Sequence, residues 1–289
     1  MAMAMFKAAA VQMRSGKNSD RNAADFERFV REAAARGAAY VQTPEMTGAV
    51  ISEKADRPGA FHALESDPVV AASRRLSKEL GVYIHVGSVA IVLPDGKIAN
   101  RAFLFGPGGV LIATYDKIHM FDVDLDNGES WRESATYAPG GRAVVADLPF
   151  ARFGLAVCYD LRFPQLFRAE ALAGANVLTA PAAFTRQTGE AHWHALLRAR
   201  AIENGAWLIA AAQGGLHEDG RQTYGHSMIV DPWGRIAAEA EGDAPGVIVA
   251  DIDISQSAAA RAKIPNLKNS RDFTIEVVAG QPDAKGAAA

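Results

Sequence analysis

Cysteine is almost absent from this chain: Cys158 is the only one in 289 residues. A single cysteine excludes a disulfide within the chain and any zinc site built from several cysteines. The sequence also lacks an apolar run of the roughly 18 to 20 residues that a membrane-spanning helix needs. Its first residues are interrupted too soon to resemble a secretory signal. We therefore expect a cytoplasmic protein that does not insert into membranes.

The chain also lacks a strong excess of either positive or negative charge. Its 30 Lys and Arg residues nearly balance its 33 Asp and Glu residues, which gives a net charge of -3. No basic stretch of the kind that binds nucleic acid or anionic membranes is present. The expected partners are a small molecule and other protein chains. With 49% hydrophobic residues, the chain is long enough to bury a large core.

Strand and helix patterns alternate along most of the chain. Between residues 83 and 115, however, three apolar runs are separated by turn sequences, which predicts hairpins and antiparallel neighbours within a mixed sheet. So many strands with so few helices favour an α/β fold in which stacked sheets are covered by helices. We expect one domain over residues 1–279 and a flexible tail at 280–289. The individual predictions are strands at 7–13, 39–43, 176–181, 207–213 and 246–252, and helices at 21–36, 68–80, 164–173 and 190–204.

Cys158 is the residue whose position most strongly suggests chemistry. It closes an apolar run that begins at Phe153 and precedes a predicted helix at 162–174. An isolated cysteine is usually a small buried hydrophobic residue. A thiol with a pKa of about 8.5 is a few per cent thiolate at neutral pH, so a nucleophilic Cys158 needs a base or a helix N-terminus nearby.

Two further polar residues follow apolar strands, Glu45 after the second predicted strand and Lys117 after the last of the three hairpin runs. Strand ends of an α/β sheet converge on one crevice, so these residues are expected near Cys158. Glu45 can accept the thiol proton and return it to a leaving nitrogen. Lys117 and the backbone N–H of Tyr159 can stabilise the oxyanion formed when sulfur attacks a carbonyl. The combination predicts acyl transfer through a thioester.

A thiol–imidazole pair is the competing arrangement, and the chain has seven histidines. His85 lies within a predicted strand and is expected in the core. His192 and His194, at the start of a predicted helix, lack a third ligand at metal-binding spacing, so we expect no metal site. The remaining histidines are His62, His119, His217 and His226.

The segments around Glu45, Lys117 and Cys158 resemble the nitrilase superfamily of carbon–nitrogen hydrolases, whose Glu, Lys and Cys occur in this order. Residues 181–193, 197–204 and 224–234 are similar to the branch that contains deaminated glutathione amidase and omega-amidase. The resemblance covers residues 6–254 and implies an α-β-β-α sandwich with two mixed sheets covered by helices, homodimers or larger homo-oligomers, and no cofactor.

The resemblance also implies site roles. Glu45 would be the general base and acid, Lys117 would stabilise the oxyanion and Cys158 would be the nucleophile. A second glutamate, Glu133, would position Lys117 and the substrate nitrogen, with Glu129 as the alternative.

The implied reaction is hydrolysis of a primary amide of a small substrate, with expulsion of ammonia and release of a carboxylic acid. Substrates of this branch carry a carboxylate, so an arginine is expected in the pocket. Arg162 is one candidate, although pairing with Asp160 is its favoured role, and Arg186 in a predicted loop is the other. The remaining candidates for contact with substrate are Phe121, Phe184, His192 and Trp193.

Deaminated glutathione is the substrate that the sequence favours within the branch. Monoamides of dicarboxylates, the omega-amidase substrates, and N-carbamoyl amino acids are the alternatives. Two readings from other classes are a catalytically silent binding protein with the same fold and a redox sensor. The redox sensor would require a resolving cysteine, which the chain lacks.

Overall fold

The computed structural model describes residues 5–125, 128 and 130–278. Over these ranges the first sheet has the strand order β17-β1-β2-β3-β4-β5, with β8 paired to β4. Parallel pairs join β1 to β2 and β2 to β3, whereas β3, β4 and β5 form the predicted antiparallel hairpins. Its strands are β1 (Met5–Gln12), β2 (Tyr40–Gln42), β3 (Tyr83–Val92), β4 (Ile98–Gly106), β5 (Val110–Asp116), β8 (Tyr137–Ala138) and β17 (Gly246–Asp253).

The second sheet has the order β16-β15-β12-β11-β10-β9 and is also mixed, since β10, β11 and β12 are parallel and the outer pairs antiparallel. Its strands are β9 (Val144–Asp147), β10 (Arg152–Leu155), β11 (Val177–Thr179), β12 (Trp207–Ala210), β15 (Met228–Val230) and β16 (Ile236–Glu239). Two short hairpins complete the described strands: β6 (Asp122–Asp124) with β7 (Ser130–Arg132), and β13 (Gly214–Leu216) with β14 (Gln222–Tyr224).

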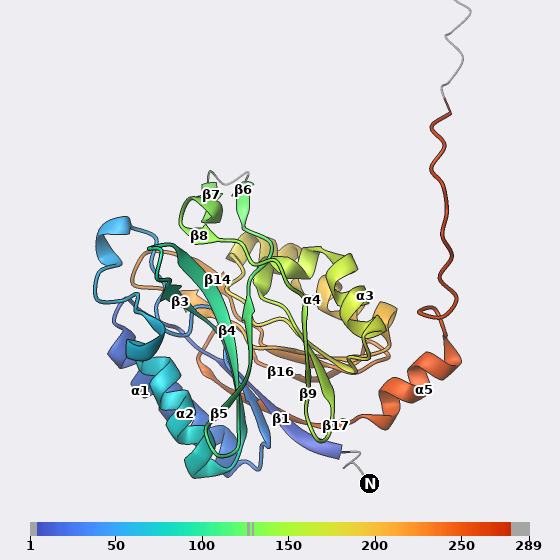
Figure 1. The fold of residues 1–289 in the computed structure, drawn as a ribbon, viewed down its shortest axis with the longest axis horizontal. Helices are drawn as coiled ribbons and strands as arrows, with labels where there is room; N and C mark the ends of the chain where they lie inside the picture. The colour runs from blue at the N-terminus through green and yellow to red at the C-terminus, as the bar shows by residue number, and fades with distance from the viewer. Residues whose placement is uncertain (1–4, 126–127, 129, 279–289) are drawn as a thin grey trace, which may run out of the picture.

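Helices cover the outer faces of both sheets, α1 and α2 on one side and α3 and α4 on the other (Figure 1). This arrangement confirms the predicted α-β-β-α sandwich. The helices are α1 (Ser19–Ala35), α2 (Pro68–Leu80), α3 (Pro164–Leu172), α4 (Arg186–Asn204) and α5 (Ser255–Lys263), and the 3-10 turns are η1 (Lys54–Asp56), η2 (Leu64–Ser66), η3 (Glu133–Ala135) and η4 (Cys158–Arg162).

Helix α2 shows how local sequence sets these boundaries. The Asp67 side chain accepts a hydrogen bond of 2.9 Å from Val70 N, which caps the helix at its start, and Pro68 occupies its first position. Gly81 ends the helix in a left-handed conformation with φ of 68°. The predicted range 68–80 is therefore confirmed. Helix α4, in contrast, begins four residues before the predicted start.

The core between the sheets follows from strand alternation. Along β1, Ala8 and Ala10 face the second sheet, whereas Ala9 and Val11 pack under α1 and α2. Aromatic rings pack between the two sheets: the rings of Tyr40 on β2 and Phe153 on β10 stack with their centroids 4.5 Å apart. This contact brings the ends of β2 and β10, which precede Glu45 and Cys158, to the same region.

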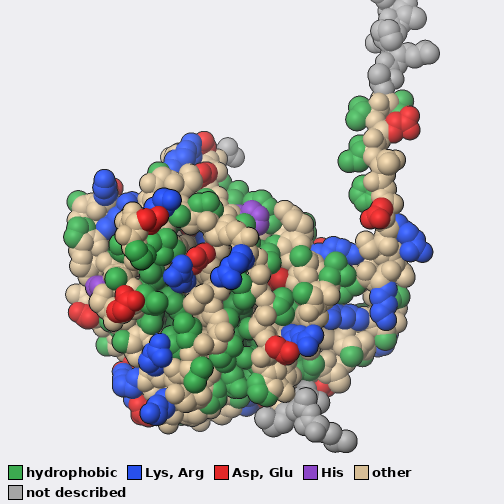
Figure 2. Space-filling model, viewed as in Figure 1, with side chains coloured by type: hydrophobic (Ala, Val, Ile, Leu, Met, Phe, Trp, Pro, Cys, Tyr) green, Lys and Arg blue, Asp and Glu red, His purple; other side chains and the backbone are tan. Residues whose placement is uncertain are grey.

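After α5 the chain runs away from the body in an irregular conformation as far as residue 278 (Figure 1). Figure 2 shows apolar side chains along this run, and Phe273, Ile275 and Val277 are all more than 80% exposed. The same view shows acidic and basic side chains interspersed over the face it presents. The tail predicted at 280–289 lies outside the described residues.

Gly87 in β3 provides a test of how tightly the first sheet supports the site. A Cβ at this position would lie 2.2 Å from Thr43 O and 2.4 Å from Pro181 Cβ. We expect Gly87→Ala to lower the free energy of unfolding by about 1–3 kcal/mol, as overpacking does, and to reduce activity by displacing the segment that carries Glu45. Urea denaturation and steady-state kinetics measure both effects. Gly246→Ala is the matched control, because an added Cβ there meets nothing within 4 Å. Equal stability of the two variants would contradict the prediction.

Candidate active site

Glu45 follows β2 after a two-residue connection and is 4% exposed. Its Oε1 accepts hydrogen bonds from Lys117 Nζ and from Asn100 Nδ2, each at 2.9 Å. Its Oε2 accepts a hydrogen bond of 3.0 Å from Ala183 N. Three donors from different parts of the chain therefore fix the carboxylate in one orientation.

Lys117 comes directly after β5 and is 2% exposed. Its Nζ lies 2.9 Å from Oε1 and 2.8 Å from Oε2 of Glu133, in addition to its contact with Glu45. Glu133 begins η3, and its Oε2 also accepts a 2.6 Å hydrogen bond from Phe121 N. One ammonium thus lies between two carboxylates. The predicted alternative to Glu133, Glu129, lies outside the described residues.

Cys158 is 7% exposed and begins η4 with φ of 52°, in the left-handed region. Met46, adjacent to Glu45, has φ of 54°. A non-glycine residue in such a conformation costs on the order of 1–3 kcal/mol and occurs most often at functional sites. Cys158 N donates a hydrogen bond of 2.9 Å to Pro181 O, which helps to hold the turn.

Asp160 fixes the turn from within. Its Oδ2 accepts hydrogen bonds from Val157 N at 2.9 Å and from the Tyr115 hydroxyl at 2.7 Å. Its Oδ1 accepts from His119 N at 3.0 Å and contacts His119 Nδ1 at 2.6 Å. The predicted pairing of Asp160 with Arg162 is wrong, because these groups already surround the carboxylate.

The backbone N–H of Tyr159 has no hydrogen-bond acceptor within the described part of the chain. It follows Cys158 directly in η4 and is therefore available to an oxygen atom bound beside the sulfur. The helix predicted at 162–174 begins at Pro164 as α3, so the 3-10 turn η4 lies between Cys158 and the N-terminus of this helix.

Burial raises the pKa of the Cys158 thiol well above its usual value; the Glu45 carboxylate raises it further, and Lys117 opposes the rise. Burial alone would also raise the pKa of Glu45, but Lys117 holds it below its usual value. Burial would lower the pKa of Lys117, and the carboxylates of Glu133 and Glu45 instead hold it well above the usual range. At neutral pH the site therefore contains a neutral thiol beside an ionised base.

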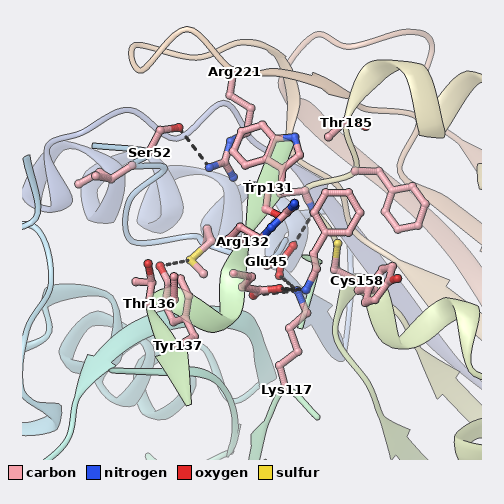
Figure 3. Close-up of a pocket in the computed structure, with 18 of the residues that line it drawn as sticks. Glu45, Ser52, Lys117, Trp131, Arg132, Thr136, Tyr137, Cys158, Thr185 and Arg221 are labelled. Atoms are coloured by element: carbon pink, nitrogen blue, oxygen red, sulfur yellow. Dashed lines mark hydrogen bonds and ion pairs between the residues drawn. The ribbon is translucent and has the colours of Figure 1, made fainter. Parts of the chain in front are cut away.

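The three side chains point into one cavity of about 360 Å³ (Figure 3). Of the predicted substrate contacts, Phe121, Arg162 and Phe184 line it. Arg162 lies over the Phe184 ring, with its guanidinium carbon 5.4 Å from the ring centre. The described residues lining the cavity also include Met46, Ile51, Ser52, Arg57, Ser130, Trp131, Arg132, Ala135, Thr136, Tyr137, Tyr159, Ala183, Thr185, Thr188 and Arg221.

Three predicted contact residues do not line the cavity. Arg186 is the first residue of α4 rather than part of a loop, and its 62% exposed side chain pairs with Glu190. Trp193 is fully buried and donates to a backbone carbonyl. His192 Nδ1 lies 3.3 Å from Arg162 Nη1, so it contacts a residue of the cavity rather than the cavity itself.

Sequence reasoning missed Asn100 and three of the arginines that line the cavity. Asn100 lies on β4, is 1% exposed, and donates from Nδ2 to Glu45 at 2.9 Å and to Glu133 at 3.1 Å. An asparagine inside an apolar strand was a usable signal, because a buried amide needs partners. The arginines lie on loops and hairpins and gave no comparable signal; they are Arg57, Arg132 and Arg221.

His85 has the core position expected for it. Burial lowers its pKa to about 3, and its Nδ1 lies 2.7 Å from the Tyr40 hydroxyl. In the ranges 5–125 and 130–278 together with residue 128, no group of three His, Cys, Asp or Glu side chains is placed to hold a metal ion. Over the same residues, no helix has the length and apolar character needed to cross a bilayer.

The sequence model of the carbon-nitrogen hydrolase family matches residues 7–262. The chain belongs to this family. Among carbon-nitrogen hydrolases it is 40% identical to the deaminated glutathione amidase of Yersinia enterocolitica, over 96% of both chains. It is 33% identical to the omega-amidase NIT2 of Homo sapiens, over 97% of this chain and all of that one.

A solved structure supports the same placement. Nit3 of Saccharomyces cerevisiae, described as a member of branch 10 of the nitrilase superfamily, superposes with a TM-score of 0.80 at 28% identity. The match covers 90% of this chain and 94% of that one. The resemblance noted from the sequence is thus confirmed for the superfamily, for the fold and for its carbon-nitrogen hydrolase activity.

The raised thiol pKa leads to a first prediction for this hydrolase site. Because the thiolate fraction grows tenfold for each pH unit below the pKa, alkylation of Cys158 by iodoacetamide should accelerate from about pH 6 to pH 9 without a plateau. Glu45→Gln should move the profile to lower pH, since it removes a negative neighbour. Mass spectrometry of the alkylated protein gives the rates. A plateau below about pH 7 in the unchanged protein would contradict the assigned charge state.

Asn100 leads to a second prediction. Asn100→Ala removes the donor shared by Glu45 and Glu133, so both carboxylates lose a buried hydrogen bond. We expect about 1–3 kcal/mol less stability in urea denaturation and a lower kcat. Asn100→Asp should be worse in both measurements, because it adds a third carboxylate to the cluster. If both variants behave like the unchanged protein, Asn100 does not position the two glutamates.

Proposed function

We propose that this carbon-nitrogen hydrolase cleaves an amide of a small, carboxylate-bearing acid through a thioester on Cys158. The observation that carries the proposal is that Glu45, Lys117 and Cys158 line one cavity, and that Glu133, which also lines it, contacts Lys117. A thiol, a buried base in contact with it and a buried cation are the groups that such a reaction needs.

In the first half-reaction Cys158 Sγ attacks the carbonyl carbon while Glu45 accepts the thiol proton. Charge that develops on the carbonyl oxygen is stabilised by Lys117 and the Tyr159 N–H. Glu45 then gives its proton to the departing nitrogen, the C–N bond breaks and the acyl group stays on sulfur. Glu133 orients Lys117 and accepts a hydrogen bond from the amide nitrogen.

In the second half-reaction Glu45 removes a proton from water as the water oxygen attacks the thioester carbon. Sulfur leaves as the C–S bond breaks and regains the proton from Glu45, and the acid is released. The lowered pKa of Glu45 keeps it ionised, ready to act as base, at the start of each half-reaction.

Deaminated glutathione is the substrate we propose, and two facts support it. A 40% identical relative carries that name, and Arg162, which lines the cavity four residues after the nucleophile, can bind a carboxylate. The scissile amide of this substrate joins a 2-oxoglutaryl group to cysteinylglycine, so the leaving group is the dipeptide amine. Hydrolysis of this substrate therefore releases the dipeptide rather than the ammonia that we expected from the sequence, because only a primary amide releases ammonia.

Similarity to the human omega-amidase favours one alternative, hydrolysis of monoamides of dicarboxylates with loss of ammonia. N-carbamoyl amino acids are a more distant alternative. A catalytically silent binding protein would not need a base, a cation and a thiol in mutual contact.

We also propose a cytoplasmic homodimer or larger homo-oligomer that does not bind nucleic acid. The even mixture of charges supports the last point, and the exposed apolar side chains between residues 273 and 278 support self-association. Sedimentation of the full chain, compared with a chain ending at residue 270, tests the oligomer.

A substrate panel tests the function. The unchanged protein should release dipeptide from deaminated glutathione faster than it releases ammonia from 2-oxoglutaramate or from N-carbamoyl amino acids. Cys158→Ala should keep its fold, measured by circular dichroism, and lose turnover of every substrate, because the chain has no second thiol. Arg186→Gln, outside the cavity, is the matched control. Comparable rates on the three substrates would contradict the choice of deaminated glutathione, and turnover by Cys158→Ala would contradict the thioester.

A further inference from the structure

Two arginines that the reaction does not use line the cavity from loops. Arg57 follows η1, and Arg221 lies in the turn between β13 and β14. We call these residues, with the neighbouring Ser52 and Thr136, the distal subsite. In Figure 3, Arg221 and Ser52 lie in the upper part of the view, Thr136 at the left and Lys117 at the bottom.

Both guanidinium groups have donors to spare. Arg57 Nη2 donates to Thr136 Oγ1 at 2.9 Å, but its Nε is buried without an acceptor. Arg221 Nη2 reaches Ser52 Oγ at 3.4 Å, and its Nε is likewise buried without a hydrogen bond. A guanidinium has five N–H donors, and leaving buried donors unpaired is unfavourable. An incoming carboxylate can accept two such bonds in parallel.

In the described part of the chain, the two guanidinium groups of the distal subsite have one carboxylate within ion-pair distance, that of Asp219. For Arg57, no carboxylate in the described part of the chain lies within ion-pair distance. Asp219 Oδ2 is 3.9 Å from Arg221 Nε, too far for a hydrogen bond, and already accepts from Ser52 Oγ at 2.7 Å. Arg132, by comparison, is paired with Asp124 at 2.8 Å.

One arginine of the distal subsite is connected to Glu133, the residue proposed to contact the amide nitrogen, through a short segment of chain. Thr136, which accepts a hydrogen bond from Arg57, directly follows η3, the turn that begins at Glu133. Arg162 belongs instead to η4, with Cys158 and the Tyr159 N–H, which hold the acyl carbon. The turn that begins at Glu133 is therefore followed by a residue that contacts Arg57, and the turn that begins at Cys158 contains Arg162.

Arg221 is also held in orientation by an aromatic ring. Its guanidinium carbon lies 4.4 Å from the centre of the Trp131 ring, a cation–π contact that fixes the plane of the group. A planar cation restrained in this way recognises a planar carboxylate with little further loss of freedom.

We infer that Arg57 and Arg221 bind a carboxylate on the amine portion of the substrate. The substrate class is then an amide with a carboxylate on each side of the scissile bond, such as an N-acylated amino acid or short peptide with a free C-terminus, rather than a primary amide. This inference rests on the proposed function, because it takes Cys158 and Glu133 to mark the acyl and amine sides.

The test compares deaminated glutathione with its C-terminal amide, which lacks only the distal charge. The unchanged protein should prefer the acid by about 10- to 100-fold in kcat/KM, the range expected for losing a charge-assisted hydrogen-bond pair. The preference should fall at least tenfold in Arg57→Gln and in Arg221→Gln, mainly through KM. Arg186→Gln, an exposed arginine outside the cavity, is the matched control and should keep the full preference.

Equal turnover of acid and amide by the unchanged protein would overturn the inference, and this comparison needs no variant to fold. A preference that survives both Gln substitutions would overturn it as well.

Binding measurements on an inactive variant test the distal subsite independently of the proposed reaction. In Cys158→Ala, calorimetry should show tighter binding of the acid than of the amide, with the difference lost when Arg57→Gln is added. That result together with no turnover by the unchanged protein would reject the reaction and support the subsite. Turnover without any difference in binding would reject the subsite and support the reaction.

Discussion

The contact of the buried Lys117 ammonium with the carboxylates of Glu45 and Glu133 is the interaction on which the site depends. An isolated charged group is strongly disfavoured in a protein interior. Here the ammonium attracts both carboxylates, and the surrounding N–H donors further stabilise them. With two carboxylates to one ammonium, the cluster keeps an excess negative charge. Burial and the Glu45 carboxylate raise the pKa of the Cys158 thiol, whereas Lys117 holds the pKa of Glu45 below its usual value against the effect of burial.

The fold supplies this cluster from separate places. Glu45 follows β2 and Lys117 follows β5 in the first sheet, whereas Cys158 follows β10 in the second. Tyr40 and Phe153, whose rings stack across the interface between the sheets, lie five residues before Glu45 and Cys158, respectively, so aromatic packing in the core sets the distance between the two strand ends. The left-handed backbone at Cys158 and at Met46 then directs the chain out of each strand abruptly enough for the side chains to meet. Asp160 and Pro181 hold the turn at Cys158 in that conformation.

Much of this arrangement was predictable from the sequence. Apolar periodicity, the Asp67 cap and Gly81 located α2, and the turn sequences located the antiparallel strands. The order of Glu45, Lys117 and Cys158 at strand ends located the centre of the cavity. What sequence reasoning could not supply was the orientation of side chains on irregular segments. Arg186 fell in a range taken for a loop, but the Thr185 cap begins the helix there and directs it to Glu190. Arg57 and Arg221 lie 164 positions apart and meet at one cavity only through the tertiary fold.

The placement of the reacting groups on two different sheets has a consequence for the life of the chain before it is fully folded. A nascent chain that ends before β10 contains the base and the cation but no thiol, and the segment from β10 onward contains the thiol without either partner. A chain made only as far as β9 therefore cannot bring a thiol to the carboxylate of Glu45. These groups meet only when the two sheets close on each other.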